Sequence, residues 1–433
     1  MDPGRRSLLR PFPVSTAYLN ADLEDGIIIY IKPPPTMRLQ PGEELRLLKA
    51  LYGTKQGAAR WSKLMAKTMI TLKFIRNRAE PSIFYRKGPK GIVICAVVVD
   101  DFAATASTPE AMKHFKNQIT NIWDCTEGGP LKWFTKLRVS RNRSKGLMKI
   151  SQETYLQRKV AEFGLENSRK VTTPMSPDCK LSKSMCPDST TSEEDMQFIR
   201  SFPYRSLLGT LQYFRLTRPD VLQAISECSK YANNPGKKHI LAALRILQYL
   251  HHHPDWGLLF TKSGRKYGSA WDIELYVNSD HAADVDTRRS RTGYVILVNN
   301  NVIDYGTAMQ SKTATSTPVA EYVALASGLK QLLWISQIIE ECEIKVNYPC
   351  QVHEDNEGCI AIANNPMAQK RTRHMEIRYH FIRDYVNDGK IKISHCPTTR
   401  MLADMLTKAL PGPALTQQRA RIMSDIKVSP DQS

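Results

Sequence analysis

The sequence predicts a fold of the α+β class, in which strand-forming and helix-forming segments follow one another along 433 residues. Ile92–Val99 is a nearly continuous apolar run, which is typical of a strand buried on both faces. A stripe of apolar side chains at helical spacing runs from Tyr322 to Ile339 and indicates a long amphipathic helix. The chain is long enough for two or three domains, each with a core of its own.

The first part of the chain combines short strands with one long helical stretch. Ile27–Ile31 is apolar and β-branched, and Glu43–Leu72 has a helical pattern over most of its length. Glycine and proline in Arg86–Ile92 predict a hairpin turn that leads into the apolar run. A similar turn at Arg143–Gly146 separates the strand-like segments 137–141 and 147–151.

The middle of the chain is polar at first and then helical. Pro174–Pro203 is rich in Ser, Thr, Pro and Asp, which predicts an exposed linker or long loop. Leu244, Leu247 and Leu250 share one face of a helix that begins near Lys238. The looser stretch 253–271 contains three glycines and predicts a domain boundary.

The last third predicts a sheet with helices. Three segments have the pattern of consecutive antiparallel strands, the last two joined by an Asn-rich turn: 274–277, 294–298 and 302–305. Thr317 can cap the long helix that follows, and Pro318 suits its first position. Further strands are expected up to His353 and at Lys390–His395, whereas the residues after Pro413 predict a frayed helix and a disordered tail.

The composition favours a polyanionic partner. A net charge of +19 is typical of proteins that bind nucleic acid, although a merely basic soluble protein is the alternative. The nine cysteines form no C-x-x-C pair, which argues against a disulfide framework or a zinc ribbon and indicates a reducing compartment. No apolar run reaches the roughly 18 residues of a membrane span, and no signal peptide opens the chain. We therefore expect a cytoplasmic and/or nuclear protein that does not enter a membrane.

Two adjacent carboxylates, Asp100 and Asp101, close the apolar run and precede a second apolar stretch, Phe102–Ala106. At the tip of a buried hairpin they would repel each other, and their burial costs free energy unless a cation compensates. Polymerases hold two Mg²⁺ ions about 3.5–4 Å apart at sites of this kind. A solvated turn is the alternative interpretation, because Asp is common in turns.

Several longer motifs resemble the reverse transcriptase of copia-type (Ty1/copia) retrotransposons. Leu48–Trp61 resembles a helix-forming signature of that family, and Val99–Asp101 resembles its metal-binding turn. Further landmarks match in the expected order: Thr16–Asn20, Thr173–Met175, Tyr204–Gly209 and Thr217–Asp220. The resemblance implies a truncated reverse transcriptase palm and thumb that performs RNA-directed DNA synthesis with Mg²⁺ (or Mn²⁺). It also implies that Lys49, Lys55 and Arg60 contact template or nucleotide.

The last third resembles the RNase H segment of the same elements. The matching motifs are Arg288–Tyr294, Ala320–Leu325, Glu354–Asn356, Arg371–Arg383 and Ala403–Lys408. The resemblance implies an RNase H-like α/β domain that hydrolyses RNA in RNA–DNA hybrids with carboxylates around two metal ions. Glu321 fits the helix position of that set, Asp355 the strand end, and Asp404 the C-terminal position. RNA, DNA and RNA–DNA hybrid are the implied partners.

Two positions depart from the family pattern. Pro13 stands where the family has its first polymerase Asp, and a proline side chain has no ligand atom for a metal. Asn278 stands where the family has the first-strand Asp of RNase H, and it offers a neutral oxygen in place of a charged one. Asp280 would face the same side of a strand, but a displacement of about 6–7 Å argues against its taking over the role.

We therefore expect residues 1–135 to hold partial reverse transcriptase fingers and palm, without protease or integrase. Residues 136–265 should form a thumb and connection region with the polar linker 174–203, followed by an RNase H-like domain at 273–412 and a tail at 413–433. The expected function is an RNA-directed DNA polymerase with RNase H, impaired in both reactions and with polymerase activity lost. The alternative is a catalytically inactive retroelement remnant that at most binds nucleic acid.

Overall fold

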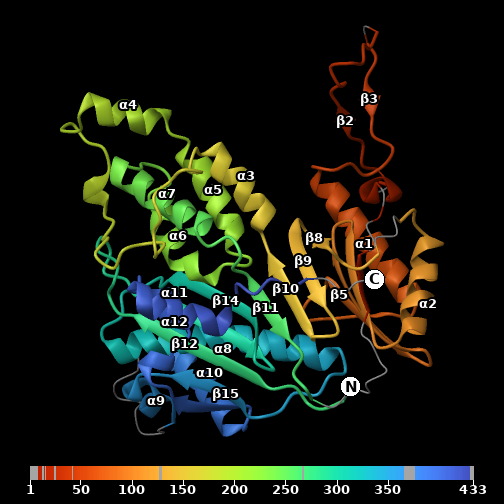
Figure 1. Ribbon diagram of the computed structural model, residues 1–433. Coiled ribbons are helices and arrows are strands. Elements are labelled where there is room, and N and C mark those ends of the chain that lie inside the picture. The colour runs from red at the N-terminus through yellow and green to blue at the C-terminus, as the bar shows by residue number, and fades with distance from the viewer. Residues whose placement is uncertain are drawn as a thin grey trace. The chain divides into compact units, whose positions relative to one another are not determined.

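The computed structural model of the protein describes residues 8–11, 14, 16–23, 26–40, 42–125, 129–265, 268–364 and 376–429 (Figure 1). The chain forms two compact units. The first comprises Met1–Lys136, Lys266–Gly268 and Ile338–Glu343, and the second comprises Leu137–Arg265, Ser269–Gln337 and Ile344–Ser433. Helices and sheets occur in both, which confirms the α+β class. Within the described ranges, no helix is long and apolar enough to cross a membrane.

The first unit is built on an antiparallel sheet with the strand order β1-β7-β6-β5-β4. Its strands are β1 (Leu8–Pro11), β4 (Ile75–Arg76), β5 (Ile83–Gly88), β6 (Gly91–Val98) and β7 (Asp101–Ala106). Helices α1 (Lys55–Thr71) and α2 (Pro109–Thr120) contribute buried side chains to the same core, and η1 (Ala17–Asn20) is a short 3₁₀ turn. The short strands β2 (Tyr30–Ile31) and β3 (Leu45–Arg46) pair with each other.

In the first unit, the sequence predicts the turns more accurately than the start of the long helix. The predicted hairpin is confirmed, because Gly88 pairs with Gly91 across a two-residue turn. The helix expected over most of Glu43–Leu72 is confirmed from Lys55 to Thr71, and the residues before Lys55 are not part of it. Gly53 has a positive φ of 87°, which a helix cannot run through, and Thr54 then caps α1 by accepting a hydrogen bond from the next turn.

Strand β6 is buried on one face more than on the other. Val93, Cys95 and Val97 are buried, whereas the residues between them are only partly covered and Val98 is 43% exposed. The expectation of a strand buried on both faces was therefore wrong. Alternating burial is the usual pattern of an antiparallel sheet that packs on a core with one face.

The second unit contains a helical region. Strand β10 (Leu147–Ser151) pairs antiparallel with β9 (Leu137–Asn142) across the predicted turn, and with β11 (Leu258–Thr261). The helices are α3 (Glu153–Glu162), α4 (Glu193–Ser201), α5 (Tyr204–Phe214), α6 (Leu222–Ser229) and α7 (Lys237–His251). Helix α7 confirms the predicted amphipathic helix, since Leu247 and Leu250 are fully buried.

The segment expected to be a polar linker is partly helical and partly packed. Met175 and Leu181 are buried in the same core as α5, α6 and α7. Helix α4 begins after Ser192, whose hydroxyl accepts a hydrogen bond from the Asp195 N–H, and acidic residues fill its first turn. A cap and acidic residues near the positive end of the helix dipole stabilise such a helix without an apolar stripe. The interpretation as an exposed linker was therefore wrong for these residues.

The second unit also contains a mixed sheet with the order β14-β13-β12-β15-β16. Its strands are β12 (Ile273–Asp280), β13 (Arg291–Val298), β14 (Asn301–Met309), β15 (Cys350–Glu354) and β16 (Ile391–His395). Strand β15 runs parallel to both of its neighbours, and the other pairs are antiparallel. These strands and the long helix α8 (Thr317–Glu341) confirm the predicted elements, and Figure 1 shows α8 alongside the sheet.

Helices cover both faces of this sheet. Gly328 of α8 lies directly against Leu275 of β12. Gly293 of β13 lies against Thr407 of the short helix α11 (Asp404–Thr407). Because Leu275 and Gly293 belong to opposite faces of the sheet, α8 and α11 lie on opposite sides of it. Helices α9 (Glu357–Asn364) and α10 (Glu376–Asn387) follow β15.

The C-terminal residues are packed rather than frayed, so the prediction of a disordered tail was wrong up to Val428. Helix α12 (Gly412–Ile422) buries Leu415 and Ile422 in the core of the helical region. Arg419 is also buried, where it donates a hydrogen bond of 2.6 Å to the Tyr249 hydroxyl. A guanidinium paired with distant aromatic residues leaves no apolar signature in its own segment.

Candidate functional site

The hairpin between β6 and β7 presents Asp100 and Asp101. Asp100 lies in the turn after Val99, whose φ is 58°, and Asp101 opens β7 and is partly buried. Burial, together with the neighbouring Asp100 carboxylate, raises the pKa of Asp101 above its usual value. The Trp61 indole N–H donates a hydrogen bond of 2.6 Å to the Val99 carbonyl and thereby fixes the turn to α1.

The described residues around this hairpin provide no third ligand. In the part of the chain that the structure describes, Asp100 and Asp101 belong to no group of three acidic, His or Cys side chains that could share an ion. Pro13, where the resemblance leads us to expect a family Asp, lies outside the described residues. The main-chain N–H of Val14 bonds to the Asp100 carbonyl at 2.9 Å, so this segment does lead to the turn.

The basic residues expected to contact template or nucleotide lie before and within α1. Lys49 is exposed and forms an ion pair of 3.2 Å with Asp22. The Arg60 Nε donates a hydrogen bond of 3.0 Å to the Asp22 carbonyl, and Lys55 is exposed at the start of the helix. An exposed ion pair of this kind contributes little to stability. The role of these residues in binding stays a prediction.

A second candidate site lies at the carboxyl ends of the parallel strands β12 and β15. The two strands pair only from Glu274–Gln351 to Tyr276–His353 and then separate. At the last pair, the rings of Tyr276 and His353 stack at 4.2 Å, and His353 bonds to Glu274 at 3.0 Å. The diverging ends of neighbouring parallel strands are a common place for ligands in sheets covered by helices.

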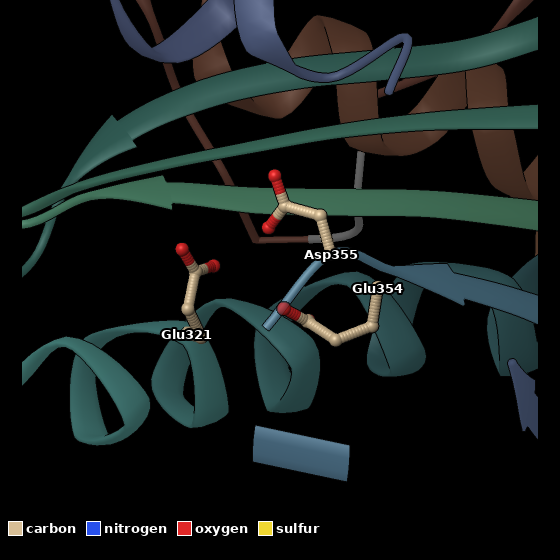
Figure 2. A group of neighbouring side chains, drawn as sticks. All are labelled: Glu321, Glu354 and Asp355. Atoms are coloured by element: carbon tan, nitrogen blue, oxygen red, sulfur yellow. The ribbon is translucent and has the colours of Figure 1, made fainter. Parts of the chain in front are cut away.

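Three carboxylates converge at this point. Glu321 comes from the first turns of α8, while Glu354 ends β15 and Asp355 follows it (Figure 2). One ligand oxygen of each lies within 4.8 Å of the others. Glu321 is 3% exposed and Glu354 is 0% exposed, whereas Asp355 is partly accessible. The structure thus brings the predicted residues Glu321 and Asp355 together and adds Glu354 to them.

The electrostatics of this carboxylate cluster, Glu321, Glu354 and Asp355, favour protonation in the absence of a cation. Burial, together with the carboxylates of Glu354 and Asp355, raises the pKa of Glu321 to about 10. Burial also raises the pKa of Glu354 to about 8. Among the described residues, the Oε2 atoms of both glutamates are buried without a hydrogen-bond partner. Buried carboxylate oxygens of this kind are costly unless a proton or a cation satisfies them.

The predicted residue Asp404 pairs with Asn278 next to this cluster. The amide Nδ2 of Asn278 donates hydrogen bonds to Asp404 Oδ1 and, at 3.3 Å, to the Thr407 hydroxyl. Lys408 lies 3.0 Å from the same Asp404 oxygen. Burial raises the pKa of Asp404, and the Lys408 ammonium opposes that rise. Asp404 is close enough to Asp355 for their charges to interact, so the Asn278–Asp404 pair and the carboxylate cluster belong to one acidic region.

Asp280 ends β12, two residues beyond Asn278. Burial raises its pKa, and the charges that act on it most are the cations of Lys408, Lys180 and Arg291. In the described part of the chain, Asp280 is not a member of the group formed by Glu321, Glu354 and Asp355. Asp280 therefore lies outside the carboxylate cluster, as expected from its displacement along the strand from Asn278.

The cluster fits a hard divalent cation, although the Asn278–Asp404 pair does not. Carboxylate oxygens are the ligands that Mg²⁺ and Mn²⁺ prefer. The Asn278 carbonyl oxygen already accepts the Ser279 N–H at 2.8 Å, and its amide nitrogen points at Asp404. An N–H group facing the carboxylate repels a cation there.

The sequence prediction missed Glu354, although a signal was available. Cys350, Val352 and Glu354 alternate along β15 and all three are buried. A glutamate on the buried face of a strand requires a specific partner, because burying an unpaired charge is costly. Thr398 and Lys408, which bond to Asp355 and Asp404, were not expected either. Thr398 and Asp355 are 43 residues apart and meet only in the folded chain, whereas Lys408 follows Asp404 by one helical turn.

Comparison with known proteins agrees with these features. Residues 6–177 match the model of the family described as reverse transcriptase (RNA-dependent DNA polymerase). The chain is 30% identical over 402 residues to the Retrovirus-related Pol polyprotein from transposon TNT 1-94 of Nicotiana tabacum, covering 92% of this chain and 29% of that protein. It is 29% identical over 416 residues to the Pol polyprotein from transposon RE1 of Arabidopsis thaliana, covering 96% of this chain and 27% of that protein.

A shorter relative and one solved structure complete the comparison. A putative transposon Ty5-1 protein of Saccharomyces cerevisiae is 24% identical over 323 residues, which cover 74% of this chain and 99% of that protein. The structure of a foamy viral protease-reverse transcriptase in complex with double-stranded DNA aligns with 94% of this chain and 62% of that chain. Its identity of 10% and TM-score of 0.22 are too low to carry an argument.

These similarities cover most of this chain but only part of the longer relatives. The chain spans less than a third of the length of the first two Pol polyproteins. Its similarity to them nevertheless extends over more than nine-tenths of its own residues. The chain is therefore similar to the Pol polyproteins of copia-type retrotransposons over nearly all of its length, and its residues 6–177 match the reverse transcriptase family.

Proposed function

We propose that the chain is an impaired retrotransposon enzyme that acts in the cytoplasm or nucleus. Its polymerase reaction is lost, and its second unit slowly hydrolyses RNA in RNA–DNA hybrids with Mg²⁺ or Mn²⁺. The observation that carries the proposal is the convergence of Glu321, Glu354 and Asp355, with Asp404 beside them, where two parallel strands separate. The +19 net charge supports a polyanionic substrate.

The hydrolytic centre depends on carboxylates that hold cations against the scissile phosphate. Glu321 and Asp355 are the residues that would hold them, whereas Asp404 is engaged by Asn278 and Lys408. Bound Mg²⁺ would lower the pKa of the attacking water and stabilise the phosphate charge. The impairment follows from Asn278, which offers no charge and directs its N–H at Asp404. Lys408 also neutralises Asp404. If the missing ligand costs about 3–4 kcal/mol of transition-state stabilisation, the rate falls by about 10²–10³.

A cleavage assay tests this proposal. The substrate is a fluorescent RNA–DNA hybrid of mixed sequence, incubated with the purified chain and Mn²⁺. Slow endonucleolytic cleavage of the RNA strand is expected, and it should disappear with chelator and in the Asp355→Asn variant. Glu357→Gln is a matched control, because Glu357 is an exposed acid two residues away on α9. Cleavage that persists in Asp355→Asn would contradict the proposed centre.

The loss of polymerase activity rests on Pro13, which replaces a carboxylate with a side chain that has no ligand atom. Primer extension on an RNA template should give no product above background with any divalent ion. Template-dependent incorporation that is abolished by Asp100→Asn would overturn this part of the proposal.

A binding protein without catalytic activity is the second candidate, and one observation favours it. The Asn278 amide and the Lys408 ammonium both interact with Asp404, so that carboxylate has partners within the protein and needs no metal ion. Such a protein would bind nucleic acid through phosphate contacts. Its affinity should fall with salt at a slope of about −0.9 per neutralised phosphate on duplex DNA. Tight, salt-dependent hybrid binding without any cleavage would identify this function.

A further inference from the structure

We propose that Glu354 is a metal ligand, and that its carboxylate binds a single divalent cation together with those of Glu321 and Asp355. The inference rests on the proposed hydrolytic centre and adds to it a third carboxylate and an ion count. The ion lies on the side of the centre formed by α8 and β15, away from the Asn278–Asp404 pair. The chain thus retains one cation site where a pair of ions would need the missing first-strand carboxylate.

The spacing of the three carboxylates matches one octahedral ion. With metal–oxygen distances of about 2.1 Å, two oxygens on the same Mg²⁺ lie about 3.0–4.2 Å apart. The ligand oxygens of Glu321, Glu354 and Asp355 all lie within 4.8 Å of one another. Movements of about half an ångström or less would bring them onto a common ion. Side-chain rotations of that size need no change in the strands or helices that carry them.

Two buried oxygens point to a ligand that the protein itself does not supply. Glu321 Oε2 and Glu354 Oε2 are both buried, and neither has a hydrogen-bond partner among the described residues. Glu354 is 0% exposed, so water is not a ready partner for it. Native proteins satisfy nearly all of their buried polar atoms. A cation bound between the two carboxylates satisfies both oxygens at once. Figure 2 shows the Glu354 carboxylate directed toward Glu321.

The remaining oxygens are held by neighbours, which orients the carboxylates. Glu354 Oε1 accepts the Asn356 N–H at 3.1 Å. The Thr398 hydroxyl donates a hydrogen bond of 3.0 Å to Asp355 Oδ2. Hydrogen bonds of this kind fix the orientation of metal ligands in many sites. Each of these two carboxylates therefore keeps one oxygen for the ion while the other is anchored to the protein.

A second ion is disfavoured on the other side of the centre. There the Asn278 amide donates to Asp404 Oδ1, and the Lys408 ammonium lies 3.0 Å from the same oxygen. A cation would have to displace a positive charge and would meet an N–H group in place of a carboxylate. We therefore expect one ion per centre in the unmodified chain and two after Asn278→Asp.

The experiment is a Mn²⁺ titration of the full chain followed by electron paramagnetic resonance and calorimetry. It is made in an Asp100→Asn, Asp101→Asn background, which removes the pair of carboxylates at the β6–β7 hairpin. One Mn²⁺ per chain is expected. Glu354→Gln keeps the shape of the side chain and should weaken binding at least tenfold, whereas Glu357→Gln, an exposed acid nearby, should leave it unchanged. Circular dichroism of each variant verifies the fold.

The outcomes separate this inference from the function on which it rests. If Glu354→Gln binds Mn²⁺ as well as the background chain while Asp355→Asn does not, Glu354 is no ligand and the inference fails, although the hydrolytic centre stands. If Glu321→Gln and Asp355→Asn also leave binding unchanged, the proposed centre itself is wrong. The ion count needs no further variant at the centre, so two ions or none in the background chain would overturn the inference even if Glu354→Gln failed to fold.

Discussion

The substitution Asn278→Asp introduces a carboxylate at the position where the sequence resemblance predicts one, and it should affect stability and cleavage in opposite directions. Without divalent cations the variant should be less stable than the unmodified chain, because two buried carboxyl groups then face each other. With Mg²⁺ or Mn²⁺ it should regain stability and cleave hybrid faster. Both effects follow from the hydrogen bond that Asn278 now donates to Asp404.

The size of the stability loss can be worked from the contacts of Asn278. A hydrogen bond to a charged group contributes about 1.5–3 kcal/mol, and the new carboxylate removes the bond to Asp404. Two carboxylates in contact cannot both remain ionised, so one takes up a proton at a further cost. We expect the metal-free free energy of unfolding to fall by about 2–4 kcal/mol. A cation at a hundred times its Kd should return about 2.7 kcal/mol.

The assay is urea unfolding followed by circular dichroism, with chelator and with Mg²⁺, alongside hybrid cleavage. Cleavage should rise by about 10²–10³ if the new ligand restores 3–4 kcal/mol of transition-state stabilisation. Asn387→Asp is a matched control, because Asn387 is exposed at the end of α10; it should change stability by no more than about 0.5 kcal/mol. The reasoning is refuted if Asn278→Asp unfolds like the unmodified chain in chelator and gains neither stability nor rate from Mg²⁺.

Three further predictions concern the rest of the second unit. In metal-free protein, the pKa of Glu354 is raised to about 8 and that of Glu321 to about 10, so the stability they contribute is present below the unfolded value of about 4.3 and is lost as the pH rises through these values. Urea midpoints measured from pH 5 to 9 should fall, and Glu354→Gln should flatten the decline, while a rising midpoint would contradict this. Asp220→Asn removes the charge that pairs with the fully buried Arg218 at 2.8 Å and should lower the free energy of unfolding by about 3–5 kcal/mol, measured by chemical unfolding. A loss below 1 kcal/mol would show that the pair is dispensable. Removal of α12 and all that follows exposes several buried apolar side chains, and the burial of each contributes about 1.5–3 kcal/mol. A dilute protease should therefore cleave the shortened chain much faster than the full chain. Equal resistance would contradict this packing.

The elements with a strong repeating pattern were predicted well from the sequence. Apolar residues at regular spacing predict helix α8 and the strands β12, β13 and β14. The hairpins at 88–91 and 143–146 were found because each contains glycine, and the first also contains proline. In each case the information lies within a few residues of the feature.

The elements that failed depend on capping or on partners far along the chain. Helix α4 is stabilised by a serine cap and first-turn acids, and its composition alone indicated a loop. Helix α12 is held in part by Arg419, whose partner Tyr249 lies on α7. No pattern within residues 412–422 can announce a contact of that kind. Tertiary packing often overrides local propensity in this way.

In the candidate site too, the features carried by local motifs were predicted and those that depend on distant contacts were not. The family motifs identified Glu321, Asp355 and Asp404, and the fold brings them into one acidic region. The role of Glu354 required knowledge of which face of β15 is buried. The position of Asn278 was found by resemblance, but its hydrogen bond to Asp404 could come only from the structure. Apart from Glu354, the carboxylates that lie together could therefore be predicted from the sequence residue by residue, whereas their hydrogen-bond partners could not.

The packing of α12 against the helical region has a consequence for synthesis on the ribosome. Helices α5, α6 and α7 share one core with Leu415, Ile422 and Met423, although the whole mixed sheet is translated between them. At about 5–20 residues per second, the ribosome needs roughly 10–30 s to pass from His251 to Met423. During that interval the apolar faces of these helices lack part of their cover and are available to chaperones. A nascent chain halted before residue 412 should therefore be retained by chaperones, and release should coincide with translation of the last helix.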